Sequence, residues 1–311
     1  MRDKGLLIRG ILRKFVVQNK QAIMKILITG CNGQLGNEMR NVLESHIPGE
    51  TLYTDIEQLD LTDPKAVEKY VLDNDVTHIV NCAAYTNVDR AEEDKLLCSS
   101  INVNAVKNIA MAANQNGAKV IHISTDYVFD GKSNRPYKES DKVNPISQYG
   151  TTKRLGETAL LALSPESVII RTAWLYSPYG KNFVKTMLRL GSEQNEIGVV
   201  CDQIGTPTYA HDLANAIYTI LTAHQWVPGI YHFSDEGACS WYDFTKAIHR
   251  IAGITDCVVK PIPSEDYPTA AARPFYSVLD RTRIKSTYGI EIPHWEESLN
   301  HCIQRINDNK E

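Results

Sequence analysis

The chain has 311 residues, of which 43% are hydrophobic and 23% are charged, which is usual for a globular protein of one large or two modest domains. This composition excludes a disordered chain, a fibre and a disulfide-rich miniprotein. The 33 Lys and Arg residues against 37 Asp and Glu residues give a net charge of -4, without a long run of either sign. The charge pattern therefore argues against a nucleic acid or a membrane surface as the partner.

The cysteines and the apolar segments bear on where the protein acts. Seven cysteines are scattered along the chain with no CxxC pair, so we expect reduced thiols and a cytoplasmic protein. No apolar run approaches the ~20 residues that a membrane-spanning helix needs. The sequence MKILITG, which begins at Met24, is a common start for a nucleotide-binding domain. We therefore interpret residues 1–23 as an upstream, disordered extension, with a short amphipathic helix as the alternative.

From Lys25 the chain alternates short β-branched runs with longer helical patterns, which predicts a parallel sheet covered by helices on both faces. The expected strands are 25–30, 50–55, 77–85, 119–125, 167–176 and 229–234. The helices expected by range are 33–46, 95–116 and 211–223, and Gly117 ends the second of them. Two more are expected: one that begins after Thr62 or Asp63 as its N-cap, and one between strands 119–125 and 167–176.

The first chemical motif is a GxxGxxG between a strand and a helix, formed by Gly30, Gly33 and Gly36. Small residues there let the backbone approach a pyrophosphate, whose charge the helix N-terminus favours. Asp55 ends the next strand, where a carboxylate can accept hydrogen bonds from an adenosine ribose. The alternative is a plain glycine turn and an unrelated Asp. Since no Arg follows Asp55 closely, we expect NADH to be usable, although other loops could admit NADPH.

These patterns together predict an α/β Rossmann fold, a doubly wound parallel sheet with a smaller, interleaved C-terminal substrate-binding lobe. We assign 24–176, plus about 204–235, to the NAD(P)-binding Rossmann domain. After about Ser177 the strand and helix rhythm loosens, with scattered Gly and Pro. We assign about 177–203 and 236–311 to the substrate-binding lobe.

The second motif is YxxxK, in which Tyr149 and Lys153 lie on one face of a helix. An ammonium group beside a phenol favours the phenolate and lowers the pKa of the phenol toward neutrality. Thr125 stands at the end of strand 119–125, where a hydroxyl can hold a substrate carbonyl. Taken singly, the pair could be a surface contact and Thr125 a turn former. Their order and spacing after the glycine motif favour a catalytic trio.

The segments GCNGQLG, NCAAYTNVDRAE, HISTDYVFDG, YGTTKRLGE, RTAWLY, NFVKTMLRL, DQIGTPTYAHDLA and ARPFYSVLD together resemble the dTDP-4-dehydrorhamnose reductase family of extended short-chain dehydrogenase/reductases. The resemblance covers the chain from Met24 onward. It implies reduction of the C4 keto group of dTDP-4-dehydro-6-deoxy-L-mannose by NADPH or NADH, giving dTDP-L-rhamnose for surface polysaccharide.

The resemblance also implies roles for individual residues. Thr125, Tyr149 and Lys153 are matched to the catalytic trio, and Asp126 and Trp174 to sugar contacts. The cofactor cleft is matched to the three motif glycines, Asp55 and the YxxxK pair. It is also matched to Gln34, Leu35, Asp60, Leu61, Ala83, Ala84, Tyr85, Thr86 and Ile123. For Trp174, a buried core aromatic is the alternative.

The nucleotide half of the substrate is expected against the second lobe, where the candidates are Asn182, Phe183, Gln203 and Arg273. Arg273 could equally be a solvated loop cation. Family members have been linked to magnesium at a carboxylate-rich dimer contact. No carboxylate cluster in this sequence clearly matches that contact, so we assign no metal site, and a homodimer is the expected assembly.

Two alternative functions stay open at this point. A nucleotide-sugar dehydratase or epimerase would need further acid or base groups, and dehydratases typically have Asp-Glu after the strand-end Thr. Here Tyr127 follows Asp126, which disfavours elimination. The regulatory subunit of methionine adenosyltransferase has a similar pattern and acts by binding a partner, but the intact glycine motif and catalytic trio favour catalysis.

Overall fold

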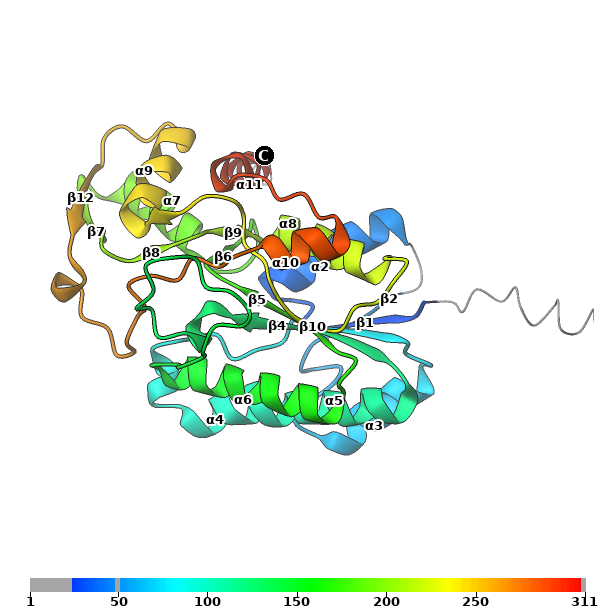
Figure 1. Ribbon diagram of the computed structural model, residues 1–311. Helices are drawn as coiled ribbons and strands as arrows, with labels where there is room; N and C mark the ends of the chain where they lie inside the picture. The colour runs from blue at the N-terminus through cyan, green and yellow to red at the C-terminus, as the bar shows by residue number, and fades with distance from the viewer. Residues whose placement is uncertain (1–23, 48–50, 309–311) are drawn as a thin grey trace, which may run out of the picture.

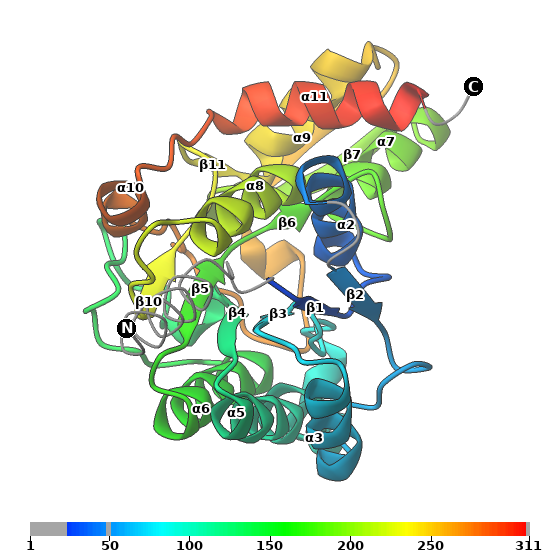
Figure 2. The ribbon, with the colours of Figure 1, turned by 90° about the vertical axis from the view of Figure 1, so that its right-hand side faces the viewer.

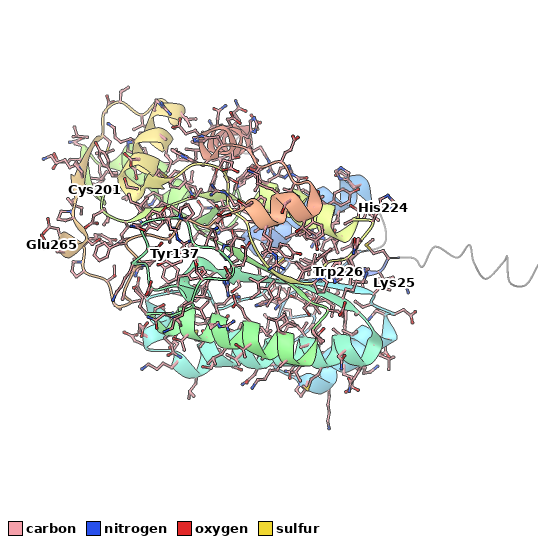
Figure 3. The ribbon with its side chains drawn as sticks, in the orientation of Figure 1. Lys25, Tyr137, Cys201, His224, Trp226 and Glu265 are labelled. Atoms are coloured by element: carbon pink, nitrogen blue, oxygen red, sulfur yellow. The ribbon has the colours of Figure 1, made fainter. Side chains whose placement is uncertain are left out.

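The computed structural model describes residues 24–47 and 51–308, so the expected extension 1–23 lies outside the described residues (Figure 1). A sheet with helices on both faces forms one part of the molecule. A second lobe lies beyond the carboxyl ends of the strands. Figure 3 labels residues at the two opposite ends of the molecule. Lys25 and Trp226 lie at the amino ends of the strands, and Cys201 and Glu265 lie in the second lobe at the other end.

Six parallel strands form the central sheet in the order β10-β5-β4-β3-β1-β2. From β1 the chain first adds β2 on one side and then returns to β3 on the other, so a crevice opens where the order reverses. This confirms the predicted doubly wound sheet. The strands are β1 (Ile26–Thr29), β2 (Thr51–Thr54), β3 (His78–Asn81), β4 (Lys119–Thr125), β5 (Val168–Thr172) and β10 (Gly229–His232).

Helices cover both faces of this sheet, as Figure 2 shows in a view toward the amino ends of the strands. On one face lie α3 (Pro64–Asp73), α4 (Lys95–Ser99), α5 (Ala105–Asn116) and α6 (Gln148–Leu163); on the other lie α2 (Gln34–His46), α8 (Ala210–Leu221) and α10 (Thr282–Tyr288). Asp63 is the cap of α3, since its carboxylate accepts from the backbone N–H of Lys65 and Ala66. Each face has its own apolar core.

The second lobe is built from short paired strands and three helices around a third apolar core. Its strands pair as β6 with β9, β7 with β12 and β8 with β11. The elements are β6 (Leu175–Tyr176), α7 (Phe183–Glu193), β7 (Glu196–Val200), β8 (Ile204–Gly205), β9 (Thr208–Tyr209), β11 (Cys239–Ser240), α9 (Trp241–Ala252), β12 (Val258–Ile262) and α11 (Trp295–Asp308). The described part of the chain also has three short 3-10 helices, η1 (Arg90–Glu92), η3 (Asp126–Val128) and η4 (Ser264–Asp266).

The expected helix 95–116 and strand 167–176 are both interrupted. Between α4 and α5 the backbone widens into the π-helical turn η2 (Ser100–Asn104), where the buried Asn102 amide pairs with the backbone of Tyr85. The strand splits into β5 and β6 because Trp174 between them has φ of +48°. Ile284 and Ile290, which fall in the range assigned to the substrate-binding lobe, pack into the core on one face of the sheet.

A buried ion pair joins helix α6 to strand β5. Arg171 donates from Nε and Nη2 to the two carboxylate oxygens of Glu157, each at 2.8 Å, and both side chains are at most 1% exposed. Ser124 of β4 donates to the same carboxylate at 2.6 Å. Burial by itself would raise the pKa of Glu157, but the hydrogen bonds and charge of Arg171 lower it. The pair therefore remains ionised and fixes α6 on the sheet.

We expect Arg171→Met to lower the free energy of unfolding by about 3–5 kcal/mol, because it removes the buried partner of Glu157 and leaves only the half-buried Arg154, 3.0 Å from one carboxylate oxygen, to pair with the buried charge. The matched control is Lys260→Met, which removes an exposed pair with Glu196 and should cost at most about 1 kcal/mol. Urea denaturation of the two variants measures both losses. Equal small losses would show that the buried pair does not hold the helix.

Candidate active site

A cleft of about 850 Å³ lies at the carboxyl ends of the central strands. Every residue that the sequence assigned to the cofactor lines it, except Tyr85. The Tyr85 side chain turns away and donates from its hydroxyl to Asp94 at 2.9 Å. Of the residues assigned to the substrate, those that line the cleft are Thr125, Asp126, Trp174 and Asn182.

The glycine motif forms a cradle in which the backbone comes unusually close to its neighbours. Gly30 has φ of +64°, and a Cβ there would lie 2.8 Å from the backbone of Ala83, two residues beyond the end of β3. A Cβ on Gly36 would lie 2.3 Å from the carbonyl oxygen of Gly30. Only glycine fits at these two positions. The cradle opens toward the N-terminus of α2, an arrangement that fits the pyrophosphate of a dinucleotide.

Two carboxylates border the adenosine end expected of such a dinucleotide. Asp55 at the end of β2 accepts from the backbone N–H of Asn32 at 3.0 Å and of Ile56 at 2.9 Å, which ties the strand to the glycine loop. Asp60 accepts from the N–H and the hydroxyl of Thr62, and these hydrogen bonds lower the pKa of Asp60. Both side chains line the cleft.

Helix α6 brings the YxxxK pair to the end of β4. Ser147 caps the helix, and a Cβ on Gly150 would lie 2.2 Å from the carbonyl oxygen of Tyr127, so the helix begins directly against η3. Burial raises the pKa of Tyr149 well above its ordinary value, and a hydrogen bond with Thr125 offsets this only in part. The expected lowering of this pKa by Lys153 is thus wrong for the protein alone. The phenol is protonated at neutral pH, the form that a proton donor requires.

The ammonium group of Lys153 hydrogen-bonds to the backbone of β4. Its Nζ donates to the carbonyl oxygen of Ile123 at 2.6 Å and lies 3.5 Å from Nε2 of His122. Burial lowers the pKa of Lys153 to about 8. Burial also keeps His122 neutral, and the amide of Asn81 contacts its other ring nitrogen at 3.0 Å. Sequence reasoning missed this buried support, because its residues face inward from two separate strands.

Asp126 offers an open acceptor in the cleft. One carboxylate oxygen accepts from the Thr125 hydroxyl at 2.9 Å, and burial raises the pKa of Asp126 to about 6. The polar side chain of Ser277, from the second half of the chain, works against this rise. Within 24–47 and 51–308, the other carboxylate oxygen has no hydrogen-bond partner although it is buried. A sugar hydroxyl would supply the missing donor.

Trp174 lies in a stack of aromatic rings at the substrate end of the cleft. The Trp241 ring lies against it with centroids 3.4 Å apart and planes 9° from parallel. Gly205 of β8 also lies against this ring. A Cβ at Gly205 would lie 2.6 Å from the Trp174 ring, so only glycine leaves room for the ring at this position. Trp241 also lines the cleft but was not found from the sequence, because the β8–β11 pairing that brings it there is not local.

Three of the residues expected to hold the nucleotide lie outside the cleft lining. Arg273 is not a free cation, because its guanidinium forms two hydrogen bonds to the carboxylate of Asp89, at 2.9 and 2.6 Å. Gln203 donates to Ser264, and Phe183 packs beside Trp241. Among the described residues, no group of three or more His, Cys, Asp or Glu could hold a metal ion, and no helix could cross a membrane.

Residues 24–308 match the family described as the RmlD substrate binding domain. This chain belongs to that family. It is 41% identical over 285 residues to a dTDP-4-dehydrorhamnose reductase of Aggregatibacter actinomycetemcomitans, covering 88% of this chain and 97% of the relative. The expected family resemblance is thereby confirmed.

Solved structures agree with this relationship. A dTDP-4-dehydrorhamnose reductase from Clostridium acetobutylicum has a TM-score of 0.88 and 45% identity, over 91% of this chain and 100% of its own. The enzyme from Bacillus anthracis, solved in complex with NADP, has a TM-score of 0.86 and 40% identity, over 91% of this chain and 99% of its own.

The pKa of Lys153 predicts how dinucleotide affinity depends on pH. The side chain is charged below pH 8 and neutral above it, so we expect the affinity for the anionic NADPH to fall as the pH rises through about 8. Fluorescence titration between pH 7 and pH ~9.5 measures the dissociation constant. The fall should be absent in Lys153→Met, which has no charge to lose. A wild-type constant that does not change over this range would contradict the expectation.

Proposed function

We propose that this protein reduces the C4 keto group of dTDP-4-dehydro-6-deoxy-L-mannose to the alcohol of dTDP-L-rhamnose, using NADPH or NADH. The observation that carries the proposal is the meeting of Thr125, Tyr149 and Lys153 in one cleft beside the glycine cradle. Similarity over 88% of this chain to one reductase of this name, and over 91% to another, supports the choice of substrate. The nicotinamide cofactor, when bound, supplies the hydride that the keto carbon receives.

The residues of the chain would act on the oxygen of the keto group. Thr125 would hold this oxygen by a hydrogen bond, and the Tyr149 phenol would donate its proton to it as negative charge develops there. Lys153 would stabilise the resulting phenolate and hydrogen-bond the ribose of the dinucleotide. The open oxygen of Asp126 would accept a hydroxyl of the sugar and orient the ring. One hydride and one proton convert the ketone to the alcohol.

The site argues against the two alternative functions. A dehydratase needs a second carboxyl next to Asp126, but Tyr127 stands there, and burial raises the pKa of its phenol. A regulatory subunit has no need of a catalytic trio, yet all three side chains line the cleft here. We also propose that the protein acts in the cytoplasm, where its seven unpaired cysteines would stay reduced. The homodimer stays a prediction.

A coupled assay tests the function directly. With enzymatically generated dTDP-6-deoxy-L-lyxo-4-hexulose, we expect oxidation of both cofactors, with NADH within about tenfold of NADPH, or ~1.4 kcal/mol of discrimination. The reason is the Asp55 carboxylate at the adenosine end, which repels a ribose phosphate. No oxidation by folded protein would favour the regulatory function. A preference for NADPH of several hundredfold would mean that another loop clamps the ribose phosphate.

The Tyr149→Phe variant tests the proton donor. It keeps the ring and its packing, so we expect kcat to fall roughly 10²-fold or more while the NADPH dissociation constant stays nearly unchanged. Lys153→Met should weaken both turnover and cofactor binding, since its side chain is proposed to serve both. Steady-state kinetics and a binding titration separate the two effects. Near-normal turnover of Tyr149→Phe would refute the proposed mechanism.

A further inference from the structure

The charged side chains that line the cleft are mostly negative. Three are carboxylates, Asp55, Asp60 and Asp126, and two are ammonium groups, Lys153 and Lys181. The Lys153 ammonium is held at the reacting end by the carbonyl oxygen of Ile123. In the part of the chain that the structure describes, Lys181 is exposed and forms neither a hydrogen bond nor an ion pair. Among the described residues it is therefore a cation without a charged partner, in a cleft that, under the proposed function, binds an anionic dinucleotide and an anionic nucleotide sugar.

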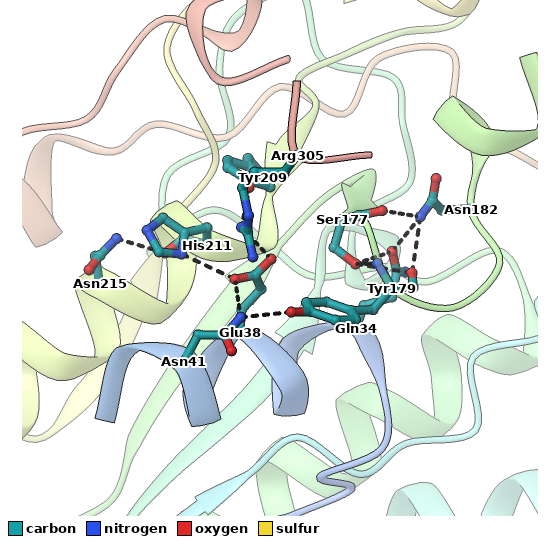
Figure 4. Close-up of polar contacts among 10 residues, drawn as sticks. All are labelled: Gln34, Glu38, Asn41, Ser177, Tyr179, Asn182, Tyr209, His211, Asn215 and Arg305. Carbon is teal, nitrogen blue, oxygen red and sulfur yellow. Dashed lines mark hydrogen bonds and ion pairs between the residues drawn. The ribbon is translucent and has the colours of Figure 1, made fainter. Parts of the chain in front are cut away.

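The loop that carries Lys181 is fixed to the glycine cradle. The neighbouring Asn182 donates from Nδ2 to Gln34 Oε1 at 2.9 Å and to the carbonyl oxygen of Ser177 at 2.8 Å, while its Oδ1 caps α7. The hydroxyl of Ser177 donates to the same Gln34 oxygen at 3.2 Å. Figure 4 shows these contacts between the loop and the first residue of α2. The loop is thereby held against the cradle from the side of the second lobe.

The backbone next to Lys181 passes close to the N-terminus of α2. Gly180 has φ of +62°, and a Cβ there would lie 3.4 Å from the side chain of Gln34. Gln34 is the first residue of α2, whose free N–H groups and dipole favour an anion. The Asn182 amide has no Nδ2 hydrogen free for a ligand, because its acceptors are Gln34 and the loop carbonyls. Lys181 is left as the charged group of this loop.

The reaction brings two diphosphates into this cleft, one in the dinucleotide and one in the nucleotide sugar. The glycine cradle and the N-terminus of α2 suit one of them. Arg273, which the sequence suggested for the other, is neutralised by Asp89 and does not line the cleft. Three carboxylates in the same cleft would repel an uncompensated diphosphate.

We propose that Lys181 binds a diphosphate in this cleft and that the contacts of Asn182 with Gln34 position its loop for this. The inference rests on the proposed function, since the dinucleotide and the dTDP-sugar of that reaction each carry a diphosphate. The ammonium would pair with the phosphate oxygens as a flexible point charge. Binding by an exposed lysine is screened by salt, so its contribution should shrink as the ionic strength rises.

Binding titrations on the full chain test the proposal with NADPH and with dTDP as separate ligands. We expect Lys181→Gln to weaken one of the two dissociation constants by about fivefold, and Lys181→Glu to weaken it further by repulsion. At an ionic strength of ~1 M the differences from wild type should largely vanish. The matched control is Lys246→Gln on α9, an exposed lysine of the same lobe outside the cleft, which should leave both constants unchanged.

The two ligands distinguish the source of the diphosphate. A weaker NADPH constant alone assigns Lys181 to the cofactor, and a weaker dTDP constant alone assigns it to the nucleotide sugar. If wild type binds both ligands and both Lys181 variants stay within twofold of it, the role of Lys181 is refuted while the proposed function stands. If wild type binds neither ligand, both are refuted.

Discussion

One buried ion pair, between Glu157 of α6 and Arg171 of β5, sets the position of the helix on which the candidate chemistry depends. Its carboxylate also receives the Ser124 hydroxyl, one residue before Thr125, so a single group fixes the helix and the strand end together. Tyr149 lies two turns earlier on the same helix. A small displacement of α6 would therefore separate the phenol from the strand-end hydroxyl that it must face.

Helix α2 is the second constraint, because it contacts both halves of the molecule. Its first residue, Gln34, bonds to the loop of the second lobe, and one turn later the fully buried Glu38 accepts from Arg305 of α11 at 2.8 Å and lies 3.1 Å from His211 of α8 (Figure 4). The hydrogen bonds of His211 and Arg305 outweigh burial and lower the pKa of Glu38. The helix whose N-terminus faces the cleft is thus anchored to the C-terminal helix.

The parts of the site that the sequence predicted are those that local spacing determines. The glycine cradle needs only the steric demands at Gly30 and Gly36, and YxxxK needs only the helical repeat. Trp241, Ser277 and the Arg273–Asp89 pair depend on contacts between distant segments, which no local pattern encodes. The lowered pKa expected for Tyr149 failed for a related reason, since burial and the orientation of Lys153 are properties of the folded protein.

The interleaving of the two halves has a consequence for how the chain folds during synthesis. Strand β10, helix α8 and Ile284 complete the core of the sheet, yet all of them follow the first segments of the second lobe in the chain. A nascent chain that has released only β1 to β5 leaves the apolar face under α8 uncovered and one edge of β5 unpaired. The ribosome must therefore deliver the chain as far as α10 before this core can close, and until then the unfinished sheet exposes an apolar face and an unpaired strand edge, two features that favour aggregation.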